Sequence, residues 1–203
     1  MCDLKYDFWL ASLTNINSSK RIQVRELCGS AQDVYELREE TLKNMHLFTD
    51  NELQHLLESQ KKDLNRAWER FIEQNIQMLP IGSKKYPQRL KDIAQPPYAI
   101  FCKGSMPDAR KSVAIVGARM CSEYGRSIAT KLGKMLAGKD VQVISGMAIG
   151  IDSASHAGAL QGKGSTFAVL GCGCDICYPK NAHNLYENIQ TSGGGILSEY
   201  PPG

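Results

Sequence analysis

The first 77 residues show the hydrophobic spacing of short helices separated by polar turns. Over residues 62–77, apolar side chains recur every three or four positions, as they do along one face of an α-helix. Ser18 and Ser19 are good N-cap residues and Gly29 is a good C-cap residue, which predicts a helix over about 20–28. Further helices are expected at 31–37 and after the capping segment 49–52. Residues 1–77 are therefore predicted to form a small all-α domain.

From residue 78 the pattern changes to short apolar runs that lead into glycine-containing turns. The runs are residues 113–116, 141–144, 167–170 and 196–197, with helical patterns between them at about 123–138, 150–162 and 181–191. Apolar strands that alternate with helices predict βαβ units and a parallel sheet covered on both faces. Two further strands, near 77–81 and 98–103, are expected to flank it. The predicted fold class is α/β, with a Rossmann-like parallel sheet domain over residues 78–203.

Charge and glycine content divide the chain at the same point. Residues 1–77 hold 10 Lys and Arg against 13 Asp and Glu, with one glycine, whereas residues 78–203 hold 14 against 8, with 17 glycines. A basic, glycine-rich region is the better place for an anionic ligand, although a solvated basic surface has the same composition. No apolar run exceeds five residues, which excludes a membrane-spanning helix.

The amino terminus and the cysteines bear on the compartment. Asp3 and Asp7 stand where a signal peptide needs positive charge and then an apolar stretch. Seven cysteines, an odd number in a mixed chain, do not resemble a secreted disulfide framework. We expect reduced thiols and a cytoplasmic protein.

The turn after the first apolar run of the sheet carries an arginine in an unusual place. Gly117 permits a tight exit from the strand, and Ser122 is a plausible cap for the following helix. Arg119 occupies the position of the second glycine in a dinucleotide-binding loop, so ordinary dinucleotide binding is disfavoured. An arginine fork near a helix N-terminus suits a phosphate instead, and a plain surface arginine is the alternative.

The next two turns carry weaker signals. Gly146 and Gly150 flank a strand-to-helix passage whose amides could cradle phosphate, and Asp152 and His156 are spaced to share a helix face. No nucleophile stands at an obvious third position, so a structural hydrogen bond or helix cap is favoured over a catalytic dyad. A third turn holds three cysteines close to His183, but it lacks the paired C-x-x-C motifs of structural zinc sites. We expect small residues filling a crowded turn and no metal.

Together these turns resemble one known family. The motifs V-G-A-R, S-G-M-A-I-G-I-D followed by His156, V-L-G-C-G, Y-P-K-N and I-L-S-E-Y-P-P-G occur in the order and spacing of the DNA-processing protein A family (DprA, also called Smf). The stretch Y-P-Q-R-L-K-D-I-A-Q-P-P-Y-A-I-F-C-K-G resembles that family's lead-in to the same domain. The match covers residues 84–203 strongly. The helical first part fits, in pattern, a domain of the sterile-alpha-motif or helix-hairpin-helix kind.

The resemblance implies an extended Rossmann-like domain that binds single-stranded DNA without cutting it. It implies no catalytic residue, no cofactor and no membrane. Family members protect incoming strands in natural transformation, help load the RecA recombinase onto DNA coated by single-strand-binding protein, and are typically homodimers. Carried over by motif, the DNA-binding candidates are Gly117, Ala118, Arg119, Ser145, Gly146, Lys180 and Asn181. Arg119 would hold a phosphate, and Tyr124, Tyr178 and Tyr200 are available for base stacking.

Relatives continue past the S-E-Y-P-P-G motif through a segment with an Arg-Asn-Arg motif. We expect this chain to be a fragment, with the rest of the sheet, much of the DNA pocket and the dimer surface in that continuation. An enzyme that binds or hydrolyses a nucleotide derivative is the alternative function, with Asp152 or Glu199 as its acid/base group. A third possible function is that of an interaction module whose ligand pocket is vestigial.

Overall fold

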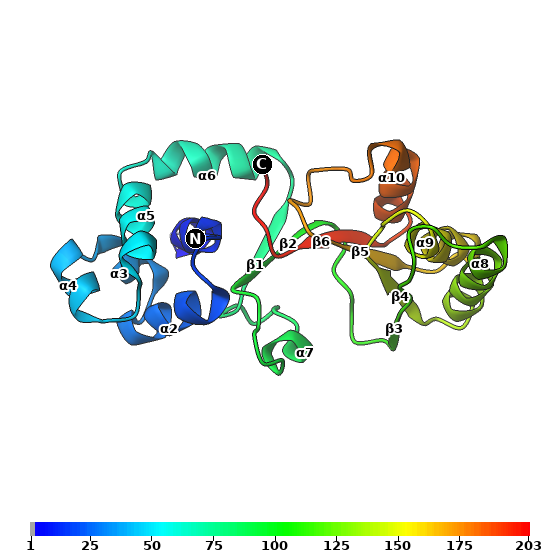
Figure 1. Cartoon of the computed structure of the whole chain (residues 1–203), viewed down its shortest axis with the longest axis horizontal. Coiled ribbons are helices and arrows are strands. Elements are labelled where there is room, and N and C mark those ends of the chain that lie inside the picture. The colour runs from blue at the N-terminus through cyan, green and yellow to red at the C-terminus, as the bar shows by residue number, and fades with distance from the viewer. Residues whose placement is uncertain (1–2) are drawn as a thin grey trace. The chain divides into compact units, whose positions relative to one another are not determined.

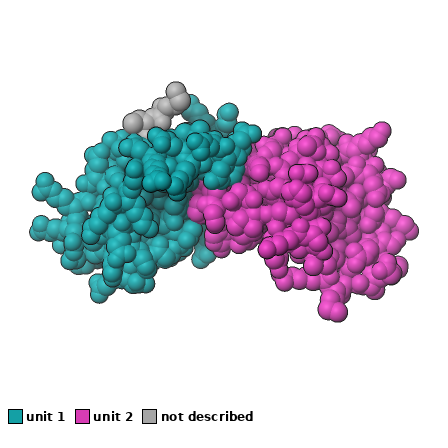
Figure 2. All heavy atoms as spheres, turned by 90° about the horizontal axis from the view of Figure 1, so that it is seen from above, with its two compact units in different colours: residues 1–100 teal, residues 101–203 magenta. Residues whose placement is uncertain are grey.

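The computed structural model describes residues 3–203, which fall into two compact units, the first ending at residue 100 and the second covering residues 101–203 (Figures 1 and 2). The first unit begins with six helices: α1 (Asp3–Ser12), α2 (Ser18–Cys28), α3 (Ala31–Glu36), α4 (Glu39–Asn44), α5 (Asp50–Gln60) and α6 (Leu64–Glu73). It then contains β1 (Gln77–Pro80), α7 (Gln88–Lys91) and the start of β2 (Ala99–Gly104). The helical character predicted for the first 77 residues is confirmed.

The helix ends follow capping chemistry, with one correction. The N-cap of α2 is Asn17, whose side chain accepts a hydrogen bond from the backbone N–H of Lys20. The predicted caps lie inside the helix, and Ser18 donates its hydroxyl to the carbonyl oxygen of Pro96 instead. Gly29 ends α2 at a φ of 95°, as its lack of a side chain allows. Thr49 and Glu52 form the expected capping box.

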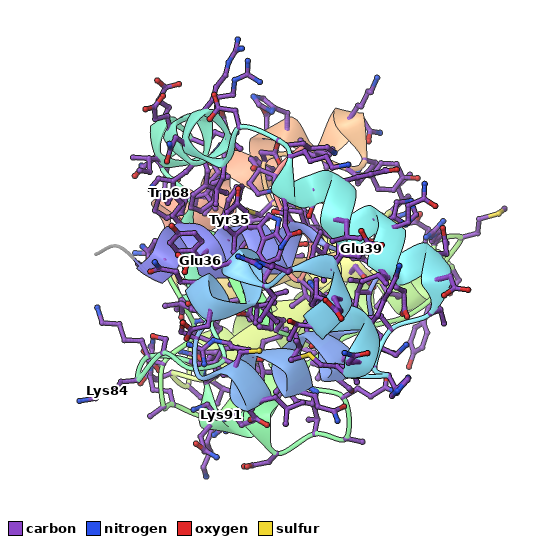
Figure 3. The ribbon with its side chains drawn as sticks, turned by 90° about the vertical axis from the view of Figure 1, so that its left-hand side faces the viewer. Tyr35, Glu36, Glu39, Trp68, Lys84 and Lys91 are labelled. Atoms are coloured by element: carbon purple, nitrogen blue, oxygen red, sulfur yellow. The ribbon has the colours of Figure 1, made fainter. Side chains whose placement is uncertain are left out.

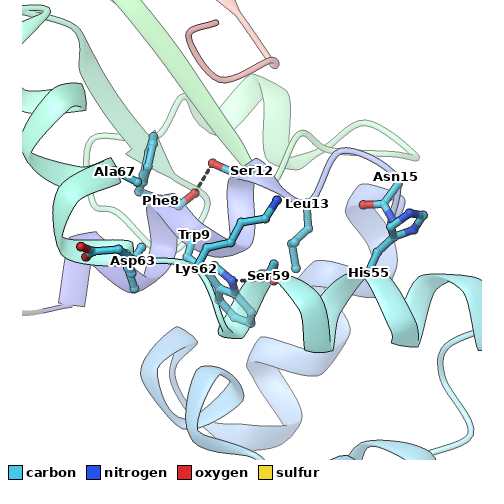
Figure 4. A pocket seen from close by; sticks show the side chains of 11 residues that line it. Phe8, Trp9, Ser12, Leu13, Asn15, His55, Ser59, Lys62, Asp63 and Ala67 are labelled. Carbon is cyan, nitrogen blue, oxygen red and sulfur yellow. Dashed lines mark hydrogen bonds between the residues drawn. The ribbon is translucent and has the colours of Figure 1, made fainter.

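Aromatic side chains form the core beside α1. Tyr35 and Trp68, labelled in Figure 3, pack against rings that α1 supplies: Tyr35 lies 4.9 Å from Trp9 and Trp68 lies 5.7 Å from Phe8, measured between centroids. A pocket of about 300 Å³ opens beside this core, between α1, α5 and the start of α6 (Figure 4). The indole N–H of Trp9 donates to the hydroxyl of Ser59, 2.8 Å away, which fixes one wall of the pocket.

The first unit extends past the predicted boundary at residue 77, up to Ile100. Tyr98 donates its hydroxyl to the Asp7 carboxylate on α1, and Arg25 donates to the same carboxylate oxygen. Burial and the nearby Asp7 carboxylate raise the pKa of Tyr98, so its phenol stays protonated and can donate. These long-range bonds tie the segment after α6 to the helices.

The second unit is an α/β layer structure. Its further elements are β3 (Ser112–Ala114), α8 (Glu123–Ala137), β4 (Gln142–Ser145), α9 (Ile151–Gln161), β5 (Thr166–Leu170), the 3₁₀ turn η1 (Lys180–Ala182), α10 (His183–Thr191) and β6 (Gly195–Ser198). The sheet order is β1-β2-β6-β5-β4-β3; β3 to β6 are parallel and β2 is antiparallel to β6. The predicted parallel sheet is confirmed, and the two further strands flank it on one side, in the order β1-β2-β6. Within residues 3–203, no helix is long and apolar enough to span a bilayer.

Two helices of the second unit pack on small residues. Helices α8 and α9 lie side by side (Figure 1), and each presents a buried glycine to the other. A Cβ atom on Gly133 would run into the carbonyl oxygen of Ser155, and one on Gly158 into that of Thr130. The close approach therefore requires glycine at both positions.

Gly158→Ala tests this packing. The added methyl group would meet backbone that must shift, so we expect the free energy of unfolding to fall by about 2 kcal/mol, even though alanine favours helix by about 1 kcal/mol. Urea denaturation followed by far-UV circular dichroism measures it. Gly171→Ala is the control, because no atom lies within 4 Å of the Cβ it would add. An unchanged midpoint for Gly158→Ala would contradict the prediction.

Candidate functional site

The carboxyl ends of β3, β4, β5 and β6 lie at one edge of the sheet, because these strands are parallel. Ligands of open parallel sheets bind at this edge. The predicted site residues fall there in three groups: Gly117, Ala118 and Arg119 after β3, Ser145 and Gly146 at the end of β4, and Lys180 and Asn181 after β5.

The carboxylate of Asp152 joins the turns that follow β3 and β4. This buried side chain accepts hydrogen bonds from the backbone N–H of Gly117, at 3.3 Å, and from that of Gly146, at 3.1 Å. The Gly146 amide is therefore not an open donor for a phosphate, which corrects the expectation that it helps to form a cradle. The two glycines instead shape the turns and hold them together.

Further bonds lock the same turns. The buried hydroxyl of Ser145 donates to the carbonyl oxygen of Ile115, at 2.6 Å. The N–H of Ile151 donates to the carbonyl oxygen of Ala118, at 3.3 Å. Gly150 has a φ of 96°, and a Cβ there would collide with the carbonyl oxygens of Ala118 and Arg119. The structure thus brings Gly117, Ala118, Ser145 and Gly146 into one bonded unit; their contact with DNA stays a prediction.

Strand β3 ends earlier than expected. The sequence predicts a strand over 113–116, but β3 ends at Ala114, although the N–H of Ile115 still donates to the Ile144 carbonyl oxygen. Val116 is 70% exposed. Because β3 is at the edge of the sheet among the described residues, no strand there extends its pairing on the outer side.

Arg119 is presented to solvent on this fixed turn. Its guanidinium forms no hydrogen bond or ion pair with any residue from 3 to 203. Ser122, three positions later, caps α8 by accepting from the N–H of Gly125, as predicted. The positive end of a 15-residue helix therefore lies just after an unpaired cation, and together they favour an anion.

Exposed tyrosines rise from three of the strand-end segments. Tyr124 is 76% exposed in the first turn of α8, Tyr178 is 58% exposed after β5, and Tyr200 is 48% exposed after β6. Rings placed in this way offer stacking surfaces for unpaired bases.

Lys180 and Asn181 share the edge but not the bonded unit. Both are exposed in η1, and no hydrogen bond within the described part of the chain links them to the turn that holds Arg119. Strand β5 is two strands away from β3, which corresponds to about 10 Å across the sheet. These two residues remain rim candidates.

The cysteine turn shows crowded packing. Burial raises the pKa of Cys174 to about 12 and also raises the pKa of Cys172 and Cys177, so these thiols stay protonated. A Cβ on Gly173 would meet the carbonyl oxygen of Pro201 at 2.8 Å. Within residues 3–203, no three His, Cys, Asp or Glu side chains are arranged to hold a metal ion.

His156 does not pair with Asp152. It is fully buried, and its Nδ1 lies 2.7 Å from the hydroxyl of Thr166, which donates to the carbonyl oxygen of Val143. Burial lowers the pKa of His156 to about 4, so the ring is neutral at physiological pH. Asp152 and His156 each form their own structural hydrogen bonds. This is the interpretation that the sequence favoured over a catalytic dyad. The sequence carried no local signal that Thr166 would be the partner of His156, because Thr166 lies on β5 and His156 lies on α9.

Comparison with known proteins identifies the family. The sequence profile of "DNA recombination-mediator protein A" matches residues 77–203, more than half of the chain. The chain belongs to the DNA recombination-mediator protein A family. The DNA processing protein DprA of Bacillus subtilis is 37% identical over 141 residues, which cover 68% of this chain and 47% of that protein. The resemblance drawn from the motifs is confirmed.

Solved structures of this family agree with the fold. The X-ray structure of DNA processing protein A from Streptococcus pneumoniae matches with a TM-score of 0.77 and 28% identity, over 98% of this chain and 68% of that one. DNA processing protein A from Helicobacter pylori, described for its single-stranded DNA binding mode, matches with a TM-score of 0.53 and 28% identity over 62% of this chain and 56% of its own. The chain spans less than half the length of the curated relatives it matches.

The buried neutral His156 predicts a pH dependence of stability. An unfolded histidine takes up its proton near pH 6.5, whereas folded His156 does so only near pH 4. Protonation therefore favours unfolding, and the free energy of unfolding should fall between about pH 6.5 and pH 4, by about 1.4 kcal/mol per pKa unit.

Chemical denaturation at a series of pH values measures this effect. His156→Gln should flatten the dependence in that interval, whereas His55→Gln, at an exposed histidine, should leave it as in the parent. Equal pH profiles for the parent and His156→Gln would contradict the assignment.

Proposed function

We propose that this chain binds single-stranded DNA at the strand-end edge of its second unit and does not cleave it. The observation that carries the proposal is the unpaired, exposed guanidinium of Arg119 on a turn that Asp152 holds rigid. Membership of a recombination-mediator family and the single-stranded DNA binding mode named for the Helicobacter pylori relative support it.

Each group at the edge has a role in this proposal. The Arg119 fork binds two oxygens of one phosphate beside the positive end of α8. Gly117, Ala118, Ser145 and Gly146 keep that turn in place. Tyr124, Tyr178 and Tyr200 stack on bases, and Lys180 and Asn181 contact the strand at the rim. Phosphate contacts and stacking are independent of base sequence, so binding should be non-specific and sensitive to salt.

In the cell, we infer a recombination mediator. The full protein would protect incoming strands during natural transformation and load RecA onto DNA covered by single-strand-binding protein, acting as a cytoplasmic homodimer. The family description supports the recombination role. The RecA, transformation and dimer assignments rest on the resemblance alone, and they concern the whole protein, of which this chain matches less than half.

Arg119→Ala should weaken single-stranded DNA binding by about 10-fold to 150-fold, because a charge-assisted contact contributes roughly 1.5–3 kcal/mol. Fluorescence anisotropy with labelled oligo-dT, and with a duplex of equal length, measures it across a salt series. The slope of log K against log salt should fall by about 0.7, the value for one phosphate contact on a single strand. Arg119→Lys should be intermediate, because lysine lacks the fork.

Lys139→Ala is the matched control for Arg119→Ala. Lys139 is an exposed cation just before β4, so it lies at the opposite edge of the sheet. Its removal should leave the affinity within a factor of about 2, as for a charge outside the interface. Equal losses in the two variants would place the DNA elsewhere.

Asp152→Asn tests whether this acid is structural or catalytic. An amide nitrogen would face one of the two backbone N–H donors, so we expect the free energy of unfolding to fall by about 1–3 kcal/mol. Nucleoside monophosphates incubated with the parent should remain unchanged. Glu199→Gln, at an exposed acid, is the control for stability. Turnover by the parent that disappears in Asp152→Asn would favour the nucleotide-enzyme alternative.

A further inference from the structure

Four cations stand within eight residues of the first unit: Lys84, Lys85, Arg89 and Lys91, hereafter the 84–91 cluster. All four side chains are exposed, and no acidic residue occurs from 74 to 91. The three lysines form no ion pair with any residue that the structure describes. These residues form an exposed, positively charged segment, which Asp92 follows, in a unit whose first 77 residues are net acidic.

The backbone that carries the cluster is firmly anchored. Tyr86 is only 4% exposed, and its hydroxyl donates to the carbonyl oxygen of Pro97, 2.7 Å away. The N–H of Ser83 donates to the Pro80 carbonyl oxygen, and the N–H of Lys85 donates to the Ser83 hydroxyl. With Tyr86 turned inward, the flanking lysine side chains stay in solvent, and Lys84 projects from the edge of the unit in Figure 3. Because this backbone is already ordered, it loses little conformational entropy when an anion binds.

The chemistry of the cluster fits a polyanion better than a small anion. Lysine presents a flexible point charge, which suits successive phosphates along a strand. The only aromatic ring within 82–91 is the buried Tyr86, so base stacking is not available there.

We propose that the 84–91 cluster is a second contact surface for the sugar–phosphate backbone of single-stranded DNA. It acts in addition to the strand-end edge of the second unit, and the proposal rests on the proposed function. The contact is purely electrostatic: it reads no bases and adds affinity that salt removes.

Lys84→Ala/Lys85→Ala in the whole chain tests this surface. With labelled oligo-dT of about 30 nucleotides, longer than the roughly 4–16 that one binding module covers, the slope of log K against log salt should fall by about 1.4. The matched control is Lys61→Ala/Lys62→Ala, an adjacent exposed lysine pair of the same unit that lies beside acidic residues, with Lys61 close enough to Glu39 to lower the pKa of that carboxyl. For this control, the slope of log K against log salt should equal that of the parent chain.

A second readout uses the unaltered chain. Acetylation of lysine side chains, followed by mass spectrometry, should show Lys84 and Lys85 protected by oligo-dT and Lys61 and Lys62 unprotected. Protection together with the reduced slope supports the proposal.

The outcomes separate the two hypotheses. If Arg119→Ala weakens binding while the Lys84/Lys85 variant keeps the parent slope and its lysines stay reactive, the second contact is wrong and the proposed function stands. If the parent chain does not bind oligo-dT, both are overturned.

Discussion

The carboxylate of Asp152 accepts hydrogen bonds from Gly117 and Gly146, and the arrangement of the strand-end edge depends on these two bonds. A buried carboxylate is costly unless donors surround it, and two backbone amides from different turns meet that requirement. The bonds fix the turn after β3 relative to the turn after β4. The turn that carries Arg119 is therefore held in place by Asp152.

The same bonds decide how an anion can be held. In a dinucleotide-binding loop, open glycine amides approach the phosphate directly. Here the Gly117 and Gly146 amides are bonded to Asp152, so positive charge must come from a side chain. Arg119 stands in the place of a loop glycine and supplies it. The exposed guanidinium and the internal carboxylate are thus two parts of one arrangement: the acid stabilises the turn, and the arginine is left unpaired for a partner.

Local patterns in the sequence predicted the elements well. The strand runs, the glycine turns, the α8 cap at Ser122 and the capping box of α5 depend on neighbours within a few residues, and all appear, although β3 ends at Ala114. What the sequence could not predict depends on distant contacts. The first unit continues to Ile100 because Tyr98 reaches Asp7, and His156 on α9 bonds to Thr166 on β5 instead of to Asp152. Likewise, both amide partners of Asp152 lie outside its helix, where periodicity gives no information.

Charge in this chain serves two different ends. Where cations face acids, as with Arg25 and Asp7 or Arg110 and Asp140, they are already paired within the fold and are less available to a ligand. Arg119 and the lysines of the 84–91 cluster have no such partner within the described residues, although the backbone beneath each is fixed by hydrogen bonds. Rigid backbone under unpaired cations lowers the entropic cost of meeting a phosphate. One arginine beside exposed tyrosines can orient a nucleotide, whereas a group of lysines without stacking rings can only add salt-dependent affinity. Under the two proposals above, these surfaces together would hold single-stranded DNA of many sequences without reading any of them.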